Sequence, residues 1–256
     1  MLWNEFSGFT FCEGTWLNTP WYLPAEVANC LSSLILVAVG VRGGAVEKEG
    51  TQRDMCRLLY AALTACGIGS ALFHAKFIYA FRFLDEFSMI HLATLGCYAA
   101  VCKRYPRGKT SFVAAVALIL SNVVLAEIDF FAPSPAVFRS LFCAPLLAVA
   151  ALTVAERRIY DPLQKGLALR ALAAAAAAGM SWAADLLLCD YALARFLFLH
   201  AWWHLFVAAA ANHLIELNFS RGENGDKRRF RGGPRLDEVR AWRLFTFLSA
   251  SPPHFV

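Results

Sequence analysis

The sequence predicts an all-α membrane protein built as a bundle of seven transmembrane helices, and three observations lead to this fold class. Of the 256 residues, 59% are hydrophobic and only 17% are charged, whereas soluble domains carry about 25% charged residues. The hydrophobic residues gather into seven long runs, each able to cross about 30 Å of hydrocarbon. The basic residues gather between alternate runs. Together these features exclude an ordinary soluble domain.

The seven predicted spans follow one another with short polar connections. They are residues 23–41, 58–79, 85–102, 110–128, 136–155, 167–189 and 196–217. The sixth is the least certain span, because Ala171–Ala178 is only mildly apolar, and a helical hairpin that enters from one side is the alternative there. We expect a segment outside the membrane at 1–22, a seven-helix membrane domain at 23–217 and a tail at 218–256. Met1–Thr10 has neither the basic nor the hydrophobic part of a cleavable signal.

The distribution of positive charge sets the orientation of this bundle. The connections after the first, third and fifth spans and the tail, together with Arg170 at the start of the sixth span, hold 20 of the 24 basic residues. The other side keeps only Lys76, Arg82, Arg139 and Arg195. Because cytoplasmic loops are enriched in Lys and Arg, the tail is expected in the cytoplasm and the N-terminus in the lumen or outside the cell. An even number of spans would scatter the basic residues over both sides.

The tail is rich in arginine and contains Gly232-Gly233-Pro234, a composition typical of a flexible segment. We expect it to lie against anionic lipids of the cytoplasmic leaflet, which attract Lys and Arg. Nucleic-acid binding is the alternative for such a tail and is disfavoured, so no nucleic acid is expected as a partner.

The eight cysteines stand at irregular spacing and include no CxxC pair, so neither a thiolate zinc site nor a redox motif is indicated. Cys12 and Cys189 both fall on the non-cytoplasmic side and form a candidate disulfide pair. Most of the others lie in hydrophobic runs, where cysteine packs as a small hydrophobic residue.

The last hydrophobic run contains two histidines, His200 and His204, four residues apart. On a helix this spacing puts both imidazoles on one face, and two neutral imidazoles can chelate a cation such as Zn²⁺. The alternative is that both merely form hydrogen bonds with neighbouring helices. Buried ionisable groups are costly in a membrane and usually mark a functional site. The pair therefore favours a metal site.

Polar residues from four spans reach a similar depth in the outer half of the membrane. These residues are Ser70, His74, Asp85, Asp185, His200 and His204. Three histidines with an open fourth position are the ligand set of a catalytic zinc ion, whose water becomes a nucleophile near neutral pH. The sequence therefore predicts a zinc-dependent hydrolytic centre near the outer surface.

Each of these polar residues also has a purely structural alternative. Ser70 can bond to a carbonyl of its own helix, and Asp85 can cap the start of the third span. Asp185 can pair with Arg195 or Lys76 across the outer rim. The remaining histidines are expected away from the metal face, and these are His91, His213 and His254.

Several blocks of the sequence resemble the alkaline ceramidases, part of the CREST superfamily of seven-transmembrane metal hydrolases that includes the progestin and adipoQ receptors. The matching blocks are Ser70-Ala71-Leu72-Phe73-His74, Leu84-Asp85-Glu86-Phe87-Ser88-Met89, His200-Ala201-Trp202-Trp203-His204, Trp182 to Asp185 with Cys189, Cys12-Glu13, and Ala25-Glu26-Val27-Ala28-Asn29. They cover roughly residues 9–217. The combination of the serine–histidine, aspartate–glutamate and paired-histidine blocks is specific, although any one alone would be weak.

The resemblance implies a role for each of these polar residues. His74, His200 and His204 would hold zinc, Asp85 would take a proton from the attacking water and pass it to the leaving amine, and Ser70 would stabilise the oxyanion. Trp203 would line the cavity for the sphingoid chain, and Asp185 would support the site from behind the ligands. The implied reaction is hydrolysis of the ceramide amide to a sphingoid base and a free fatty acid by the membrane domain.

The resemblance also implies a calcium site near the N-terminus, formed by Glu13, Glu26 and Asn18. Thr10 and Phe11 stand where the family has Asp and Trp, and the spacing from Cys12 to Glu26 is longer by two, which puts this site in doubt. Further departures lie beside the zinc site, where the family has other residues, and these are Lys76, Arg82 and Ser88.

Two other classes of seven-helix membrane protein are alternatives to the hydrolase. An adipoQ-type lipid receptor or sensor with residual hydrolase activity is the main alternative, but its usual orientation, with the N-terminus inside, disagrees with the charge distribution. A retinal-binding protein needs a lysine in the last span, and Phe196–Leu217 contains none. We expect the endoplasmic reticulum or Golgi membrane as the location, with the plasma membrane as the alternative.

Overall fold

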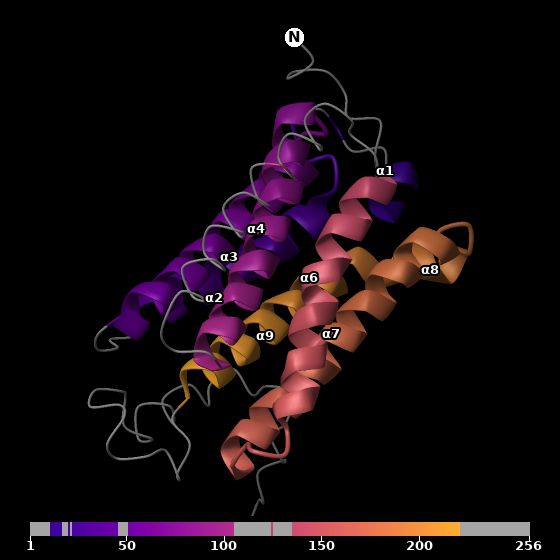
Figure 1. Cartoon of the computed structure of the whole chain (residues 1–256). Coiled ribbons are helices and arrows are strands. Elements are labelled where there is room, and N and C mark those ends of the chain that lie inside the picture. Colours follow the sequence, from indigo (N-terminus) through magenta and orange to yellow (C-terminus); the bar gives the residue numbers. More distant parts are fainter. Residues whose placement is uncertain are drawn as a thin grey trace, which may run out of the picture.

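The computed structural model describes residues 11–16, 20, 22–45, 51–104, 124 and 135–220, and these form helices without any strand among them (Figure 1). Two helices are short, α1 and α8, and six are long enough to form a bundle. The helices are α1 (Cys12–Trp16), α2 (Val27–Ala45), α3 (Thr51–Ala75), α4 (Tyr79–Arg104), α6 (Pro135–Glu156), α7 (Pro162–Leu188), α8 (Ala192–Leu197) and α9 (Leu199–Phe219).

The six long helices close into a ring. Helices α2, α3, α4 and α6 pack in chain order, α6 touches α7, and α9 packs on both α7 and α2 (Figure 1). The short helices α1 and α8 touch each other at one end of the bundle. Because α9 contacts both halves of the ring, its histidines lie where residues from α2, α3 and α4 can meet them.

Two glycines let α2 and α3 approach closely. A Cβ atom on Gly40 would lie 2.8 Å from the carbonyl oxygen of Tyr60, and one on Gly67 would lie 2.7 Å from the backbone nitrogen of Val37. Small residues of this kind allow membrane helices to pack backbone against backbone. The close crossing brings polar side chains of α2 within reach of those on α3.

The seven-span prediction is borne out only in its coarser part, an all-helical chain with membrane-length helices. Among the described residues, four helical segments are long and apolar enough to cross a membrane: Val27–Ala45, Asp54–Ala75, Ala136–Glu156 and Pro162–Leu188. Helices α4 and α9 are not in this set, and both carry ionisable residues of the predicted site. The fourth predicted span, 110–128, lies outside the described residues apart from residue 124. The count of seven and the orientation stay predictions.

The sixth predicted span is one continuous helix rather than a hairpin, since α7 runs unbroken through the alanine tract. Asp161 begins it with a capping box, in which the Asp161 side chain accepts from the Gln164 N–H and the Gln164 side chain accepts from the Asp161 N–H. After α7 and the short helix α8, Phe198 has a positive φ of 46°. This left-handed residue separates α8 from α9, so the last long helix begins three residues later than the predicted span.

Candidate metal centre

Three buried histidines meet inside the ring. One potential ligand atom from each of His74, His200 and His204 can be chosen so that all three lie within 4.8 Å of one another, and among the described residues these three form a candidate metal-binding group. Their ring centroids are 4.8–5.1 Å apart. The exposed fraction of each side chain is at most 4%. The predicted convergence of the second and last spans is therefore present in the fold.

Hydrogen bonds from α2 fix the ring of His204. Ser32 Oγ donates to the carbonyl of Asn29 and lies 2.7 Å from His204 Nδ1, so it is left to accept the Nδ1 proton. This arrangement leaves Nε2 of His204 with a lone pair, facing Ser70 Oγ at 3.2 Å. Ser32 therefore orients His204 in the manner of the groups that orient metal-binding histidines.

A carboxylate orients His74 in the same way. Glu26 Oε2 lies 2.5 Å from His74 Nδ1, and both side chains are fully buried. Because the carboxylate accepts the Nδ1 proton, the lone pair of His74 is on Nε2. That nitrogen is buried without any hydrogen-bond partner. A buried ring nitrogen without a hydrogen-bond partner, grouped with two other histidines, fits the chemistry of a metal ligand.

The segment before α2 covers this centre. The ring of Phe11 stacks on His200 with centroids 3.6 Å apart. Glu26 Oε1 holds the segment in place by accepting from the backbone N–H groups of Phe11, at 2.8 Å, and Gly14, at 3.1 Å. One carboxylate thus links the covering segment to one of the three clustered histidines.

The predicted disulfide between Cys12 and Cys189 is confirmed, with Cα atoms 5.3 Å apart across a sequence separation of 177 residues. It ties α1 to the end of α7.

Replacing both cysteines by serine is expected to lower the free energy of unfolding by about 2–5 kcal/mol, because the unfolded chain regains the freedom of a long loop. Thermal unfolding of the purified protein measures this. Cys143→Ser, at a free half-buried cysteine, is the control, and equal unfolding temperatures for both variants would contradict the expectation.

Asp85 and Ser70 lie beside the three histidines. Asp85 is not a helix cap, as the structural alternative had it, because α4 already begins at Tyr79. Its carboxylate is buried, receives a hydrogen bond from Ser70, and has no hydrogen-bond partner at Oδ1. Ser70 bonds across helices to Ser33, at 3.1 Å, and to His204. The serine thus joins the aspartate to one of the three clustered histidines.

Asp185 stands behind the centre rather than in it. Its carboxylate accepts from the backbone N–H of Cys12 at 3.2 Å and from that of His200. No ion pair joins Asp185 to Arg195 among the described residues, and Arg195 Nε donates instead to the Cys189 carbonyl, so that predicted alternative is wrong. Asp185 therefore connects α7 to the covering segment and to the first turn of α9.

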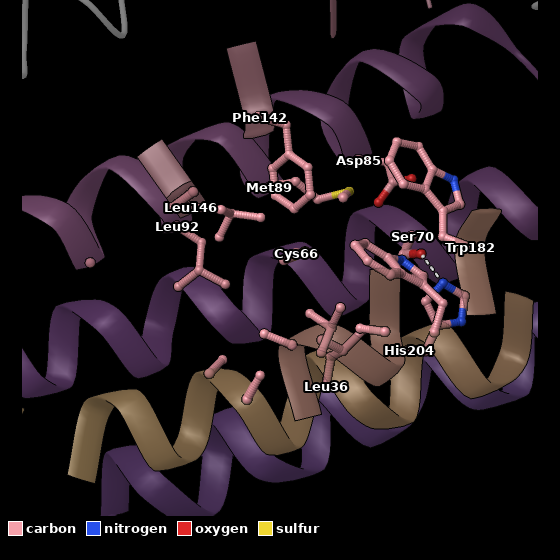
Figure 2. Close-up of a pocket in the computed structure, with 18 of the residues that line it drawn as sticks. Leu36, Cys66, Ser70, Asp85, Met89, Leu92, Phe142, Leu146, Trp182 and His204 are labelled. Atoms are coloured by element: carbon pink, nitrogen blue, oxygen red, sulfur yellow. Dashed lines mark hydrogen bonds between the residues drawn. The ribbon is translucent and has the colours of Figure 1, made fainter. Parts of the chain in front are cut away.

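A long cavity extends from the centre along the inside of the ring (Figure 2). In Figure 2, Asp85, Ser70 and His204 lie near one end, with Leu92 and Leu146 toward the other. Trp203 lines the cavity as expected and packs against Trp182, with ring centroids 5.4 Å apart. Apolar side chains from every long helix form most of the wall.

One of the residues that depart from the implied family pattern, Arg82, pairs with a residue that lines the cavity. Arg82 is buried and its Nε lies 3.1 Å from Glu86 Oε1, one helical turn further along α4. Glu86 and Arg139 both line the cavity. The other described histidines lie off the metal centre, as expected: His91 stacks on Phe87, and His213 lies 3.5 Å from Glu216.

The described part of the predicted calcium set serves other purposes. Both oxygens of Glu26 already accept two N–H bonds each. Glu13 caps the start of α2 by accepting from the N–H groups of Ala28 and Asn29, while burial raises the pKa of its carboxyl. Asn18 lies outside the described residues. These two carboxylates do not form an open calcium cage, and calcium binding stays a prediction.

The roles of four residues at the centre were missed by sequence reasoning. Ser32 and Ser33 form an adjacent pair inside an otherwise apolar span, a signal that was available in the sequence. Glu26 was noticed, but for calcium rather than for its bond to His74. Phe11 was noticed only as a departure from the family pattern, and its stacking on His200 could not be predicted from an aromatic residue outside the predicted spans.

The family model described as Ceramidase matches residues 4–225. The chain is 24% identical over 215 residues to alkaline ceramidase 3 of Mus musculus, covering 78% of each chain. It is 28% identical over 227 residues to an alkaline ceramidase of Caenorhabditis briggsae, covering 85% of this chain and 82% of the relative. A relative from Dictyostelium discoideum, dcd3A, is 30% identical over 134 residues, which cover 46% of this chain and 45% of the relative.

Proposed function

This chain belongs to the ceramidase family, and from that premise we propose that it is a zinc-dependent amide hydrolase that cleaves ceramide within the membrane. The products are a sphingoid base and a free fatty acid. The observation that supports this proposal is the group of three buried histidines beside Asp85 and Ser70, at the end of an apolar cavity. The family match does not favour the receptor alternative.

The donor set fits zinc. Three neutral imidazoles leave a fourth position open, as in catalytic zinc sites. Glu26 and Ser32 each accept an Nδ1 proton, which fixes the neutral form of His74 and His204 with Nε2 available. The buried and unpartnered Nε2 of His74 supports a metal ion as the missing partner. A bound zinc ion would supply a Lewis acid and lower the pKa of a bound water toward neutrality.

The residues of the chain perform the proton transfers. Asp85 Oδ1 has no other hydrogen-bond partner, so it is free to accept a proton from the attacking water as that water adds to the amide carbonyl. The Ser70 hydroxyl donates to the developing oxyanion. When the carbon–nitrogen bond breaks, Asp85 returns the proton to the leaving amine. Phe11, stacked over His200, keeps bulk water from the reacting carbonyl.

The cavity suits a substrate that stays in the bilayer. Its polar lining gathers at the metal end, where an amide and hydroxyl groups need partners, and the rest of its wall is almost entirely apolar. We place one alkyl chain of the substrate along this wall, beginning beside Trp203. Anionic lipids are proposed as partners of the basic tail at 218–256, which lies outside the described residues from 221 on. The location in the endoplasmic reticulum or Golgi membrane stays a prediction.

The proposal is tested with purified protein, a panel of ceramides, and measurement of released sphingoid base. His200→Ala is expected to lower turnover by at least about 100-fold, since losing a ligand costs more than losing a group that orients one. Bound zinc, measured by elemental analysis, should fall in parallel. His213→Ala, at a histidine on the same helix but away from the centre, should keep both.

Equal release of sphingoid base by the folded wild type and His200→Ala would overturn the hydrolase proposal. A receptor predicts instead that no ceramide is turned over and that a partner binds the cytoplasmic loops only when a lipid ligand is present.

A further inference from the structure

Gly96 leaves a gap in the wall of the cavity. A Cβ atom built on it meets no heavy atom within 4 Å, whereas a Cβ on Gly40 or Gly67 would collide with a neighbouring helix. Gly96 is also one of the residues that line the cavity. A larger side chain at this position would therefore extend into free space.

Gly96 lies on the face of α4 that follows the cavity away from the metal centre. Asp85, Met89, Leu92 and Gly96 all line the cavity and recur at intervals of three or four residues, which is one face of a helix. Figure 2 shows Asp85, Met89 and Leu92 in this order along the cavity. A side chain at 96 is thus expected to project into the path of any alkyl chain that starts beside Asp85.

The depth of Gly96 can be expressed as a length of alkyl chain. At a rise of about 1.5 Å per residue, Gly96 lies about 16 Å from Asp85 along α4. An extended alkyl chain with carbon–carbon bonds of about 1.5 Å advances about 1.25 Å per carbon. Gly96 is therefore level with about the thirteenth carbon. By the same measure Asn218, at the far end of the lining, is about 21 Å from His204, or about 17 carbons.

We propose that Gly96 determines the chain-length specificity of this enzyme, because its missing side chain lets an alkyl chain pass from about the twelfth carbon to the end of the cavity. This inference rests on the proposed function, since it concerns the substrate of that site. The shared chemistry is a saturated chain of about 16 to 18 carbons attached to the hydrolysed amide, and either the fatty-acyl or the sphingoid part supplies it.

The test compares wild type with Gly96→Ala, Gly96→Leu and Gly179→Leu. Gly179 on α7 is the matched control, because a Cβ there also meets no atom within 4 Å, but the residue is exposed and does not line the cavity. All three substitutions replace a mid-helix glycine by a good helix former, so the three variants should fold. One substrate series varies the acyl chain from 8 to 18 carbons with a fixed base, and the other varies the base with a fixed acyl chain.

Gly96→Leu is expected to lower turnover of the 16- and 18-carbon members of one series at least about 10-fold relative to the 8- and 10-carbon members, because the added side chain occupies the path. Gly96→Ala should show a smaller change in the same direction, and Gly179→Leu should match wild type. The series that responds identifies the chain in the cavity. An unchanged length profile in Gly96→Leu, or an equal loss for all lengths, would overturn the inference.

A binding measurement separates this inference from the proposed function. Saturated fatty acids and long-chain amines of graded length are added to the purified proteins, and the unfolding temperature is followed. In wild type the stabilisation should grow up to about 16 carbons, and in Gly96→Leu it should stop growing near 12. If wild type shows this dependence but hydrolyses no ceramide, the proposed reaction fails while the role of Gly96 stands. If the two proteins share one dependence, the role of Gly96 is refuted.

Discussion

Asp85→Asn is expected to lower ceramide turnover by about 10²–10⁴-fold while the zinc content stays unchanged. Asparagine keeps the shape of the side chain and its hydrogen bond with Ser70, but it cannot take up the proton of the attacking water. The close packing of α3 against α4 supports this expectation. Gly69 lets α3 approach α4 so closely that a Cβ there would lie 3.1 Å from the backbone nitrogen of Asp85. That close approach holds Asp85 next to Ser70, one turn from His74.

The measurement combines initial rates with elemental analysis of the same samples. Asp190→Asn, at an exposed aspartate in the turn after α7, is the control for the substitution itself. A variant at position 85 that keeps the wild-type rate would remove Asp85 from the proton transfer. A variant that loses zinc along with activity would show instead that the aspartate maintains the metal centre.

Glu26→Gln is expected to weaken zinc binding by about 10- to 100-fold, the usual effect of changing the group that orients a ligand histidine. The carboxylate accepts the Nδ1 proton of His74 and also the backbone N–H groups of Phe11 and Gly14. Glu26→Ala removes all of these acceptors from a fully buried place, so it should in addition lower the free energy of unfolding by about 3–5 kcal/mol.

Zinc affinity is measured by competition with a chelator, and stability by thermal unfolding of the zinc-free protein. Glu216→Gln is a matched control, because Glu216 also lies beside a histidine of α9, His213, which is away from the metal. Zinc affinity that is unchanged in both Glu26 variants would mean that His74 is oriented by its helix alone.

The helices of the fold could be predicted because their signal is local. Long hydrophobic runs form helices wherever they stand, and the structure contains a helix for each predicted span that falls in the described residues. Their limits were less accurate. The third predicted span began at residue 85, but α4 begins at Tyr79. The first turns of α4 contain polar residues such as Arg82, so they do not belong to a hydrophobic run. The structure shows that Arg82 pairs with Glu86 on the same helix.

The metal centre was predictable to the extent that its residues carry unusual chemistry in an apolar setting. A histidine or aspartate in a hydrophobic run is costly to bury and therefore indicates a function. The position of each such residue along its span predicted that these residues lie at a similar depth in the membrane. The residues that orient them were not predictable in their roles. Ser32, Glu26 and Phe11 act through contacts between segments that are distant in sequence. Glu26 and His74, for example, are separated by 48 positions.

The sequence by itself determined that this chain is helical, hydrophobic enough for a membrane, and equipped with three histidines, an aspartate and a serine at matching depth. Only the tertiary structure decided that α9 packs between α7 and α2, that Glu26 and Ser32 direct the imidazoles, and that Gly96 opens the cavity beyond the metal centre. The reason is physical. Hydrophobicity and helical periodicity act over one segment, whereas ring orientation and free volume depend on which backbones approach one another closely.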